Sequence, residues 1–335
     1  MIIFSSAVAG CDRINIERKA VNLAKKNGKR LEIINLIDEM VKVANETNPY
    51  INSKNLPNLD IENIKVLKDH TLQRIKERVK EDPKKDYIID GHMSFWWREG
   101  PLNIMNSKDM RVLNPNFFIS VVNDPMSINN NLHKKKSWED KAIDEYQIAL
   151  WSELEAYTTD LISNSVGKKN YIIGAREDPR TLFELMYKDY KPKAYISYSI
   201  EHRKSGYESL ERFIEKIRRY LIVFNPKSVD IDVYKMSADE RLKNLIFNQT
   251  VRRDFHLVDQ SDITIVYMSD LVYSSGVDGE RMHAHFSGKK VLLYFPFERY
   301  SPFTPYFVDK MYKSEKELIE EIKRLAKVYS EGKRI

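Results

Sequence analysis

The chain has little of the residue types from which disulfide frameworks and most metal sites are built. Its 335 residues include one cysteine, Cys11, and seven histidines. A single cysteine excludes an internal disulfide and a cysteine-based metal site, and it suits a reducing cytoplasm. His283 and His285 are the closest pair of histidines, but two residues apart on a predicted helix they point to different faces. We therefore expect a cytoplasmic protein with no bound metal and no cofactor.

Long apolar runs are also missing. No stretch approaches the roughly 20 apolar residues of a membrane span, and the apolar start MIIFSSAVAG lacks the basic residues that open a secretory signal. The formal net charge is only +6, with lysines spread along predicted helices; the compact run 133–136 is typical of a solvated loop. No DNA- or RNA-binding motif is present. We expect neither membrane nor nucleic acid as a partner, whereas a mononucleotide or another phosphorylated small molecule suits this charge.

Strands and helices alternate along the first half of the chain. Predicted strands cover 1–9, 30–36, 86–92, 116–125 and 170–178, and predicted helices cover 15–26, 38–56, 62–80 and 137–165. A Trp-rich loop is expected at 95–97. Alternation at this spacing predicts a parallel sheet covered by helices.

The second half repeats this organisation. A β-rich run at 194–199 precedes an amphipathic helix whose apolar residues recur at helical spacing: Leu210, Phe213, Ile214, Ile217, Leu221 and Ile222. Residues 251–295 follow as helix, buried strand, polar loop, helix and buried strand, and an amphipathic helix over 314–329 ends the chain. The length suggests two domains, and the proline-containing segment 189–193 suggests a short linker. We predict an α/β protein with two Rossmann-like, doubly wound parallel-sheet domains, 1–188 and 194–335.

One carboxylate of the second half stands where an active site is expected. Glu280 follows a strand and a run of small residues that includes Ser274 and Gly276, at a predicted loop-to-helix turn. Ligands of open α/β sheets bind at the carboxyl ends of the strands, and a helix N-terminus favours an ionised carboxylate. Glu280 is therefore a candidate nucleophile; the alternative is an acidic first-turn residue that merely suits the helix dipole.

The order of several motifs adds a family resemblance. A first strand with Tyr195 near its end, Asp254 in the helix before the next strand, and the turn Ser274-x-Gly276-x-x-x-Glu280 follow one another over the last 145 or so residues. This segment resembles the nucleoside 2-deoxyribosyltransferase superfamily, which includes deoxynucleoside 5′-monophosphate N-glycosidases. The chain departs from that pattern at Asp278 and Met282, where family members usually have glycine, and in a first loop that is not rich in glycine and arginine.

The resemblance implies an enzyme that cleaves an N-glycosidic bond. It assigns Glu280 as the nucleophile, Asp254 to orient the sugar or serve the leaving base, and Tyr195 to position Glu280 or the sugar; substrate contacts are expected from Ser199, Ser274 and Gly276. Read from the residues alone, Asp254 could instead be a solvated helix residue paired with an adjacent arginine, and Tyr195 a core residue of the sheet.

The first half loosely resembles the P-loop nucleoside monophosphate kinases, the archaeal adenylate kinase type most closely. The strand, loop and helix at 1–26, the strand end with Asp90 and His92, and the segment 113–125 carry the similarity; Gly10, Arg13, Asp90 and His92 are the nucleotide-binding candidates. A working P-loop needs several glycines, then Lys and Ser/Thr. Arg13 and Ile14 stand at those last two positions, and isoleucine cannot bind Mg²⁺. An inert scaffold and a nucleotide-sensing domain both stay open.

The predicted function is hydrolysis or base transfer at the N-glycosidic bond of a nucleoside, nucleotide or NAD-like substrate, with the first domain as a nucleotide-binding or regulatory module. The first alternative is a non-catalytic nucleotide sensor, and the second is a nucleoside monophosphate kinase. The superfamily resemblance also implies a homo-oligomer. The aromatic, proline-rich segment 294–307 is expected at the contact between protomers or along the substrate pocket.

Overall fold

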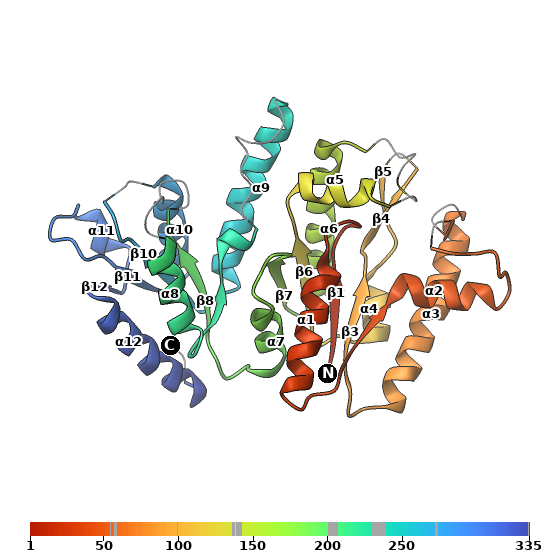
Figure 1. The fold of residues 1–335 in the computed structure, drawn as a ribbon, viewed down its shortest axis with the longest axis horizontal. Coiled ribbons are helices and arrows are strands. Elements are labelled where there is room, and N and C mark those ends of the chain that lie inside the picture. The colour runs from red at the N-terminus through yellow and green to blue at the C-terminus, as the bar shows by residue number, and fades with distance from the viewer. Residues whose placement is uncertain are drawn as a thin grey trace. The chain divides into compact units, whose positions relative to one another are not determined.

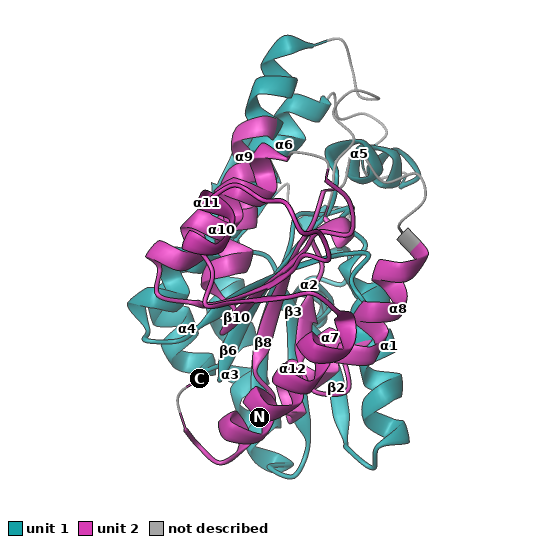
Figure 2. Cartoon of the chain, turned by 90° about the vertical axis from the view of Figure 1, so that its left-hand side faces the viewer, with its two compact units in different colours: residues 1–179, 231–246 teal, residues 180–230, 247–335 magenta. Residues whose placement is uncertain are grey.

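The structure is a computed structural model that describes residues 1–53, 55–56, 59–98, 100–135, 138, 143–199, 207–229, 239–271, 274–333 and 335 (Figure 1). The chain divides into two compact units, residues 1–179 with 231–246, and residues 180–230 with 247–335 (Figure 2). The division falls ahead of the predicted linker at 189–193. Within that segment Lys191 is buried, and its Nζ donates to Glu184 Oε1 and to the backbone oxygen of Arg218 at 2.9 and 2.8 Å.

The first unit contains a five-stranded parallel sheet in the order β2-β3-β1-β6-β7. Its strands are β1 (Ile2–Ser6), β2 (Leu31–Asn35), β3 (Asp86–Gly91), β6 (Phe117–Val122) and β7 (Asn170–Gly174). Every strand predicted for this half is therefore present, somewhat shorter than expected. The predicted Trp-rich loop is wrong: Trp96 lies in a small antiparallel pair, β4 (Ser94–Trp97) with β5 (Gly100–Asn103), and packs against Trp151 with ring centroids 5.7 Å apart.

Helices surround this sheet. They are α1 (Arg13–Lys26), α2 (Leu36–Asn45), α3 (Ile61–Glu81), α4 (Ser107–Leu113), α5 (Pro125–His133) and α6 (Glu145–Ser165). A capping box between Asp144 and Gln147 defines the start of α6. The predicted helix covered 137–165, and of its first residues 137 and 139–142 lie outside the described part of the chain. The short helix α4 was not predicted, and Asn106 caps it with a second capping box.

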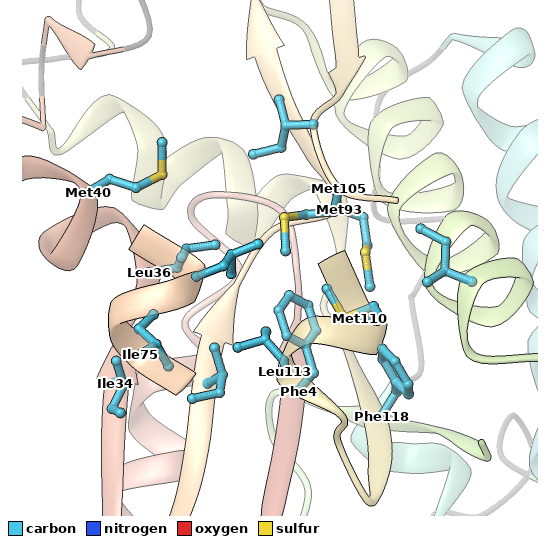
Figure 3. Packing of buried hydrophobic residues seen from close by; sticks show 14 of the residues in the cluster. Phe4, Ile34, Leu36, Met40, Ile75, Met93, Met105, Met110, Leu113 and Phe118 are labelled. Carbon is cyan, nitrogen blue, oxygen red and sulfur yellow. The ribbon is translucent and has the colours of Figure 1, made fainter. Parts of the chain in front are cut away.

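A large hydrophobic cluster of the first unit lies between its sheet and helices that include α2, α3 and α4. Phe4 of β1 and Phe118 of β6 are fully buried and pack together with ring centroids 5.9 Å apart. Figure 3 shows them facing Met110 and Leu113 of α4, and α2 and α3 extend the same cluster. Burial of such side chains contributes roughly 1.5–3 kcal/mol each.

The second unit contains another five-stranded parallel sheet, in the order β12-β11-β10-β8-β9. Its strands are β8 (Lys193–Ser197), β9 (Ile222–Phe224), β10 (Ile263–Tyr267), β11 (Lys290–Tyr294) and β12 (Lys310–Tyr312). Its helical segments are α7 (Pro179–Tyr187), α8 (Tyr207–Ile217), the 3-10 turn η3 (Pro226–Ser228), α10 (Ser275–Phe286), α11 (Phe303–Tyr306) and α12 (Glu315–Ser330). The helix α9 (Glu240–Asp259) begins among residues of the first unit and ends among those of the second. The predicted α/β class with two parallel sheets is confirmed. One detail is wrong: Leu221 and Ile222 lie beyond the end of α8, and Ile222 begins β9.

The two faces of the second sheet differ in character. Ala194 and Ile196 of β8 join an apolar cluster with residues of α8 and α12. Because neighbouring side chains of a strand point to opposite faces, Tyr195 and Ser197 face the other way, where α10 packs (Figure 2). That second face carries the candidate site. None of the described helices has the length and hydropathy to cross a membrane.

Candidate functional site

Glu280 projects from α10 toward the end of β8. Ser274 caps this helix, its Oγ accepting from the backbone N–H of Val277 at 3.4 Å, so Glu280 falls on the second turn. The prediction that it stands in the loop-to-helix turn is therefore wrong, and Asp278 is the acidic residue of the first turn. The hydroxyl of Ser197 donates to Glu280 Oε2 at 2.5 Å, which ties the helix to the carboxyl end of the strand.

The carboxyl of Glu280 is held in an unfavourable environment for charge. Burial, and next the negative charge of Asp254, raise its pKa from 4.5 to about 8. We had expected the helix dipole to favour the ionised form, but the dipole acts mainly within the first turn, and burial exceeds it here. Glu280 as a whole residue has intermediate exposure. A carboxyl with a strongly raised pKa beside a second acidic group is a candidate for catalysis.

Asp254 and Tyr195 complete the cluster. Asp254 lies on α9 beside Arg253, whose Nε is 3.4 Å from Oδ1, and both side chains are largely shielded, with 16% and 12% of their surface exposed. The expected pairing with a neighbouring arginine is thus present, but in a partly buried position that also influences Glu280. Tyr195 is completely buried, and its pKa is raised well above 10, first by burial and then by the charges of Glu280 and Asp254. Its phenol therefore stays protonated and can donate.

The three predicted substrate contacts differ in how they are placed. Ser199 is buried, two residues beyond the end of β8. The oxygen of Ser274 is engaged as the cap of α10. Gly276 is exposed, and a Cβ there would meet nothing closer than the Ser274 Oγ at 3.8 Å, so local packing does not demand glycine at this position.

Sequence reasoning missed two members of the cluster, Ser197 and Arg253. The period-two pattern of β8 placed Ser197 on the same face as Tyr195 and could have found it. Arg253 was considered only as an arginine adjacent to Asp254, because helical spacing alone does not show which arginine turns inward.

The loop after β1, where a kinase would hold phosphate, is packed by protein. Gly10 has φ +83°, and a Cβ at this position would lie 2.9 Å from the backbone oxygen of Ile128 and from Leu132 Cγ, both on α5. Asn131 of α5 also donates to the Gly10 carbonyl at 3.0 Å. This glycine is therefore required by the close approach of α5.

Arg13 is buried and fully engaged within the first unit. Its guanidinium forms an ion pair with Asp90, donates to the backbone oxygens of Ser5 (3.2 Å) and Gly91, and lies 4.0 Å from Glu17 Oε1. The structure therefore brings the predicted residues Arg13, Asp90 and His92 together, and their polar groups contact one another.

His92 is held neutral in this cluster. Burial, and then the charge of Arg13, lower its pKa from 6.5 to about 3. Its Nδ1 contacts the backbone oxygen of Ala7, and its Nε2 lies 3.5 Å from the Arg13 guanidinium. These partners define a tautomer that donates from Nδ1 and accepts at Nε2, so His92 is built into the structure of the loop.

An open cleft lies next to the closed loop. It has a volume of about 280 Å³ and is lined mainly by polar groups of α1 and of the loops after β1, β6 and β7: Asp12, Asn15, Lys19, Asn123, Arg176 and Glu177. None of the four nucleotide-binding candidates belongs to its described lining. Over the part of the chain that the structure describes, no group of three or more His, Cys, Asp or Glu side chains is placed to hold a metal ion.

Each half of the chain has counterparts among known proteins. A family model described as an AAA domain matches residues 20–148, beginning within α1, beyond the packed loop. No curated protein matches the chain.

Three solved structures are similar over about two fifths of the chain. They are a conserved protein from Enterococcus faecalis V583 (16% identity, covering 40% of this chain and 99% of that one, TM-score 0.29), a 2-deoxyribosyltransferase from Bacillus psychrosaccharolyticus (14%, 38% and 90%, TM-score 0.30) and the CMP N-glycosidase BcmB from Clostridium botulinum (17%, 40% and 98%, TM-score 0.27).

Proposed function

We propose that the second unit cleaves the N-glycosidic bond of a nucleoside, a nucleotide or an NAD-like dinucleotide, with Glu280 as the nucleophile. The observation that carries the proposal is the environment of this carboxyl, which is hydrogen-bonded by Ser197, lies near Asp254 and Tyr195, and has a strongly raised pKa. It stands at the carboxyl end of a parallel strand, where open α/β sheets bind ligands.

The cluster supplies the groups that a two-step displacement requires. In the first step a Glu280 oxygen bonds to the anomeric carbon as the carbon–nitrogen bond breaks, and the base leaves with that electron pair and takes up a proton. The neutral phenol of Tyr195 can supply that proton, whereas Asp254, whose negative charge acts on Glu280, would orient the sugar. In the second step water, or a second base, attacks the anomeric carbon, its proton passes to the group that protonated the leaving base, and the ester bond breaks to restore the carboxylate.

The test of this proposal is an assay for free base. The full chain is incubated with a panel of ribo- and deoxynucleosides, their 5′-monophosphates and NAD, and the products are separated by chromatography. We expect base release from at least one class of substrate. A folded protein that releases no base from any of them would exclude the proposed reaction.

For the first unit we propose a binding or regulatory role. The packed loop at Gly10 and the internally paired Arg13 favour ligand binding without phosphoryl transfer, and Ile14 adds no ligand for Mg²⁺. If neither unit were catalytic, the chain would be a nucleotide sensor, and the polar cleft beside α1 is the feature that favours this second candidate function.

The pH dependence of base release should follow the ionisation of Glu280. A nucleophile acts in its ionised form, so kcat/KM should rise with pH through about 8, the pKa of this carboxyl. The charge of Asp254 contributes to raising that pKa, so Asp254→Asn should lower it. We expect the acid limb of the profile to move to lower pH in this variant, even where the overall rate falls.

Profiles of kcat/KM between pH 5 and 10 for the wild type and Asp254→Asn check this expectation. An activity that falls as pH rises through 8 would indicate that Glu280 acts as an acid in its protonated form and would contradict the nucleophile role. Lys243→Met, which removes an exposed pair with Glu240 on the same helix, should leave the profile unchanged.

We also propose that the protein is at least a dimer. In the aromatic segment 294–307, Phe295 and Phe307 are buried within the unit, whereas Phe303 and Tyr306 are 68% and 70% exposed. Phe286 of α10 contacts Phe307 and is 72% exposed itself. Exposed aromatic clusters of this kind are typical of interfaces.

Light scattering at micromolar concentration should therefore give a mass of at least two chains. The double variant Phe303→Ser/Tyr306→Ser should shift it toward one chain of about 40 kDa, whereas Tyr50→Ser, at an exposed tyrosine of the first unit, should not. A wild type that is monomeric and still releases base would contradict the proposed dimer and show that the exposed aromatic side chains do not mediate self-association.

A further inference from the structure

Ser197 is the residue whose hydroxyl contacts the carboxyl of Glu280. It is the last residue of β8, it is completely buried, and its hydroxyl lies 2.5 Å from Glu280 Oε2. A serine side chain has a single rotatable bond to its oxygen, and burial leaves that oxygen little freedom. The strand therefore offers the carboxyl a donor at a defined point.

The other groups that face Glu280 have different effects on the ionisation of its carboxyl. From β8 the buried phenol of Tyr195 approaches, and from α9 come the charge of Asp254 and, more weakly, that of Arg253. Arg253 is itself paired with Asp254 at 3.4 Å, which reduces its net effect on a third group. The negative charge of Asp254 opposes ionisation of Glu280, whereas the hydroxyl of Ser197 favours it.

We infer that Ser197 is a positioning residue for Glu280: its hydroxyl holds Oε2 and so presents Oε1 to the anomeric carbon of the substrate. This inference rests on the proposed function, since it assigns the attacking oxygen of that reaction. A carboxylate has two equivalent oxygens, and one fixed hydrogen bond is sufficient to make them different. Fixing the plane of the carboxylate also keeps the reacting atom in the near-attack geometry on which displacement rates depend.

The hydrogen bond has a second, measurable consequence. A donor that binds the ionised form stabilises that form and lowers its pKa, and hydrogen bonds to charged groups are among the stronger ones. Ser197 thus offsets part of the effect of burial and of Asp254. Without it, Glu280 would hold its proton to higher pH and would be ionised in a smaller fraction of molecules.

The experiment measures the Glu280 carboxyl directly, in the full chain and without substrate. Protein labelled with ¹³C at glutamate side chains is titrated by NMR, with Glu280→Gln assigning the signal. In Ser197→Ala we expect the midpoint of Glu280 to rise by about one pH unit, equivalent to a tenfold smaller ionised fraction at low pH. Ser197→Thr, which keeps the hydroxyl, should restore the midpoint.

Thr264→Val is the matched control. Thr264 is a completely buried hydroxyl residue on the neighbouring strand, in register with Tyr195, and valine has nearly the same shape. This variant should leave the titration of Glu280 unchanged. Thermal unfolding establishes that each variant is folded, and Ser197→Cys, a weaker donor of similar size, replaces the alanine variant if that chain does not fold.

Base release provides the second readout. Against the best substrate of the panel, Ser197→Ala should lose about tenfold more kcat/KM at pH 6.5 than at pH 9.5, because the missing bond matters most where ionisation limits the rate. An unchanged Glu280 midpoint in Ser197→Ala, or an equal loss at both pH values, would overturn the positioning role. If the wild type releases no base while the midpoint still shifts, the hydrogen bond stands, but the proposed reaction fails and the positioning role for it fails too.

Discussion

Replacement of Glu280 by glutamine should reduce base release by at least about a thousandfold, equivalent to roughly 4 kcal/mol of barrier. Glutamine keeps the size of the side chain and can still meet the hydroxyl of Ser197, but it has no charge to stabilise or attack the anomeric carbon. The unfolding temperature should not fall, because the substitution removes a carboxyl that burial disfavours in its charged form. Steady-state rates and thermal unfolding measured on the same preparation check both expectations.

The matched control is Glu298→Gln in the same unit. This side chain is 90% exposed and lies 3.9 Å from Lys313, so its loss should leave both activity and stability near those of the wild type. Residual activity of Glu280→Gln within about tenfold of the wild type would remove Glu280 from the role of nucleophile.

Replacement of Arg13 by methionine should destabilise the first unit by about 3–5 kcal/mol, a large part of the stability of an ordinary domain. The guanidinium is buried between Asp90 and Glu17, and both carboxyls are buried with it. Without Arg13 these groups would lose their cation, and the carbonyls of Ser5 and Gly91 would lose a donor. Arg13→Lys, which keeps the charge, should recover part of the loss.

Urea unfolding followed by far-ultraviolet circular dichroism measures this effect. Arg18→Met is the control, because Arg18 lies on the same helix and is exposed. If Arg13→Met were no less stable than Arg18→Met but failed to bind nucleotide, Arg13 would be a ligand of phosphate and not an internal partner of Asp90.

The arrangement of the candidate site follows from local patterns in the sequence. The strand-helix alternation of the second half predicts β8, β10 and α10 correctly, and parallel strands bring their carboxyl ends to one edge. The superfamily resemblance implied that Tyr195 positions Glu280 or the sugar, and in the structure the two side chains influence each other. The charge state of Glu280 was not predictable, because it depends on Asp254 of α9, a neighbour that only the tertiary fold defines.

In the first half, too, the roles of residues depend on neighbours that are distant in the sequence. Gly10 was interpreted as the surviving glycine of a phosphate-binding loop, whereas its conformation serves the packing of Leu132, a residue more than a hundred positions later. The pairing of Arg13 with Asp90 joins residues that lie 77 positions apart in the sequence (90 − 13). The kinase resemblance drew attention to these residues, but only the contacts in the structure show that Arg13 and Asp90 pair with each other.

The most direct test of Glu280 as a covalent nucleophile is the detection of a sugar attached to it. The wild type is mixed with an active substrate of the panel, quenched in acid within one turnover, digested with protease and mapped by mass spectrometry. We predict that the peptide containing Glu280 gains the mass of the sugar, and that Glu280→Gln and a quench before substrate show no such gain. A sugar attached to another residue would contradict the account, as would base release with rapid turnover and an unmodified Glu280 peptide at every quench time.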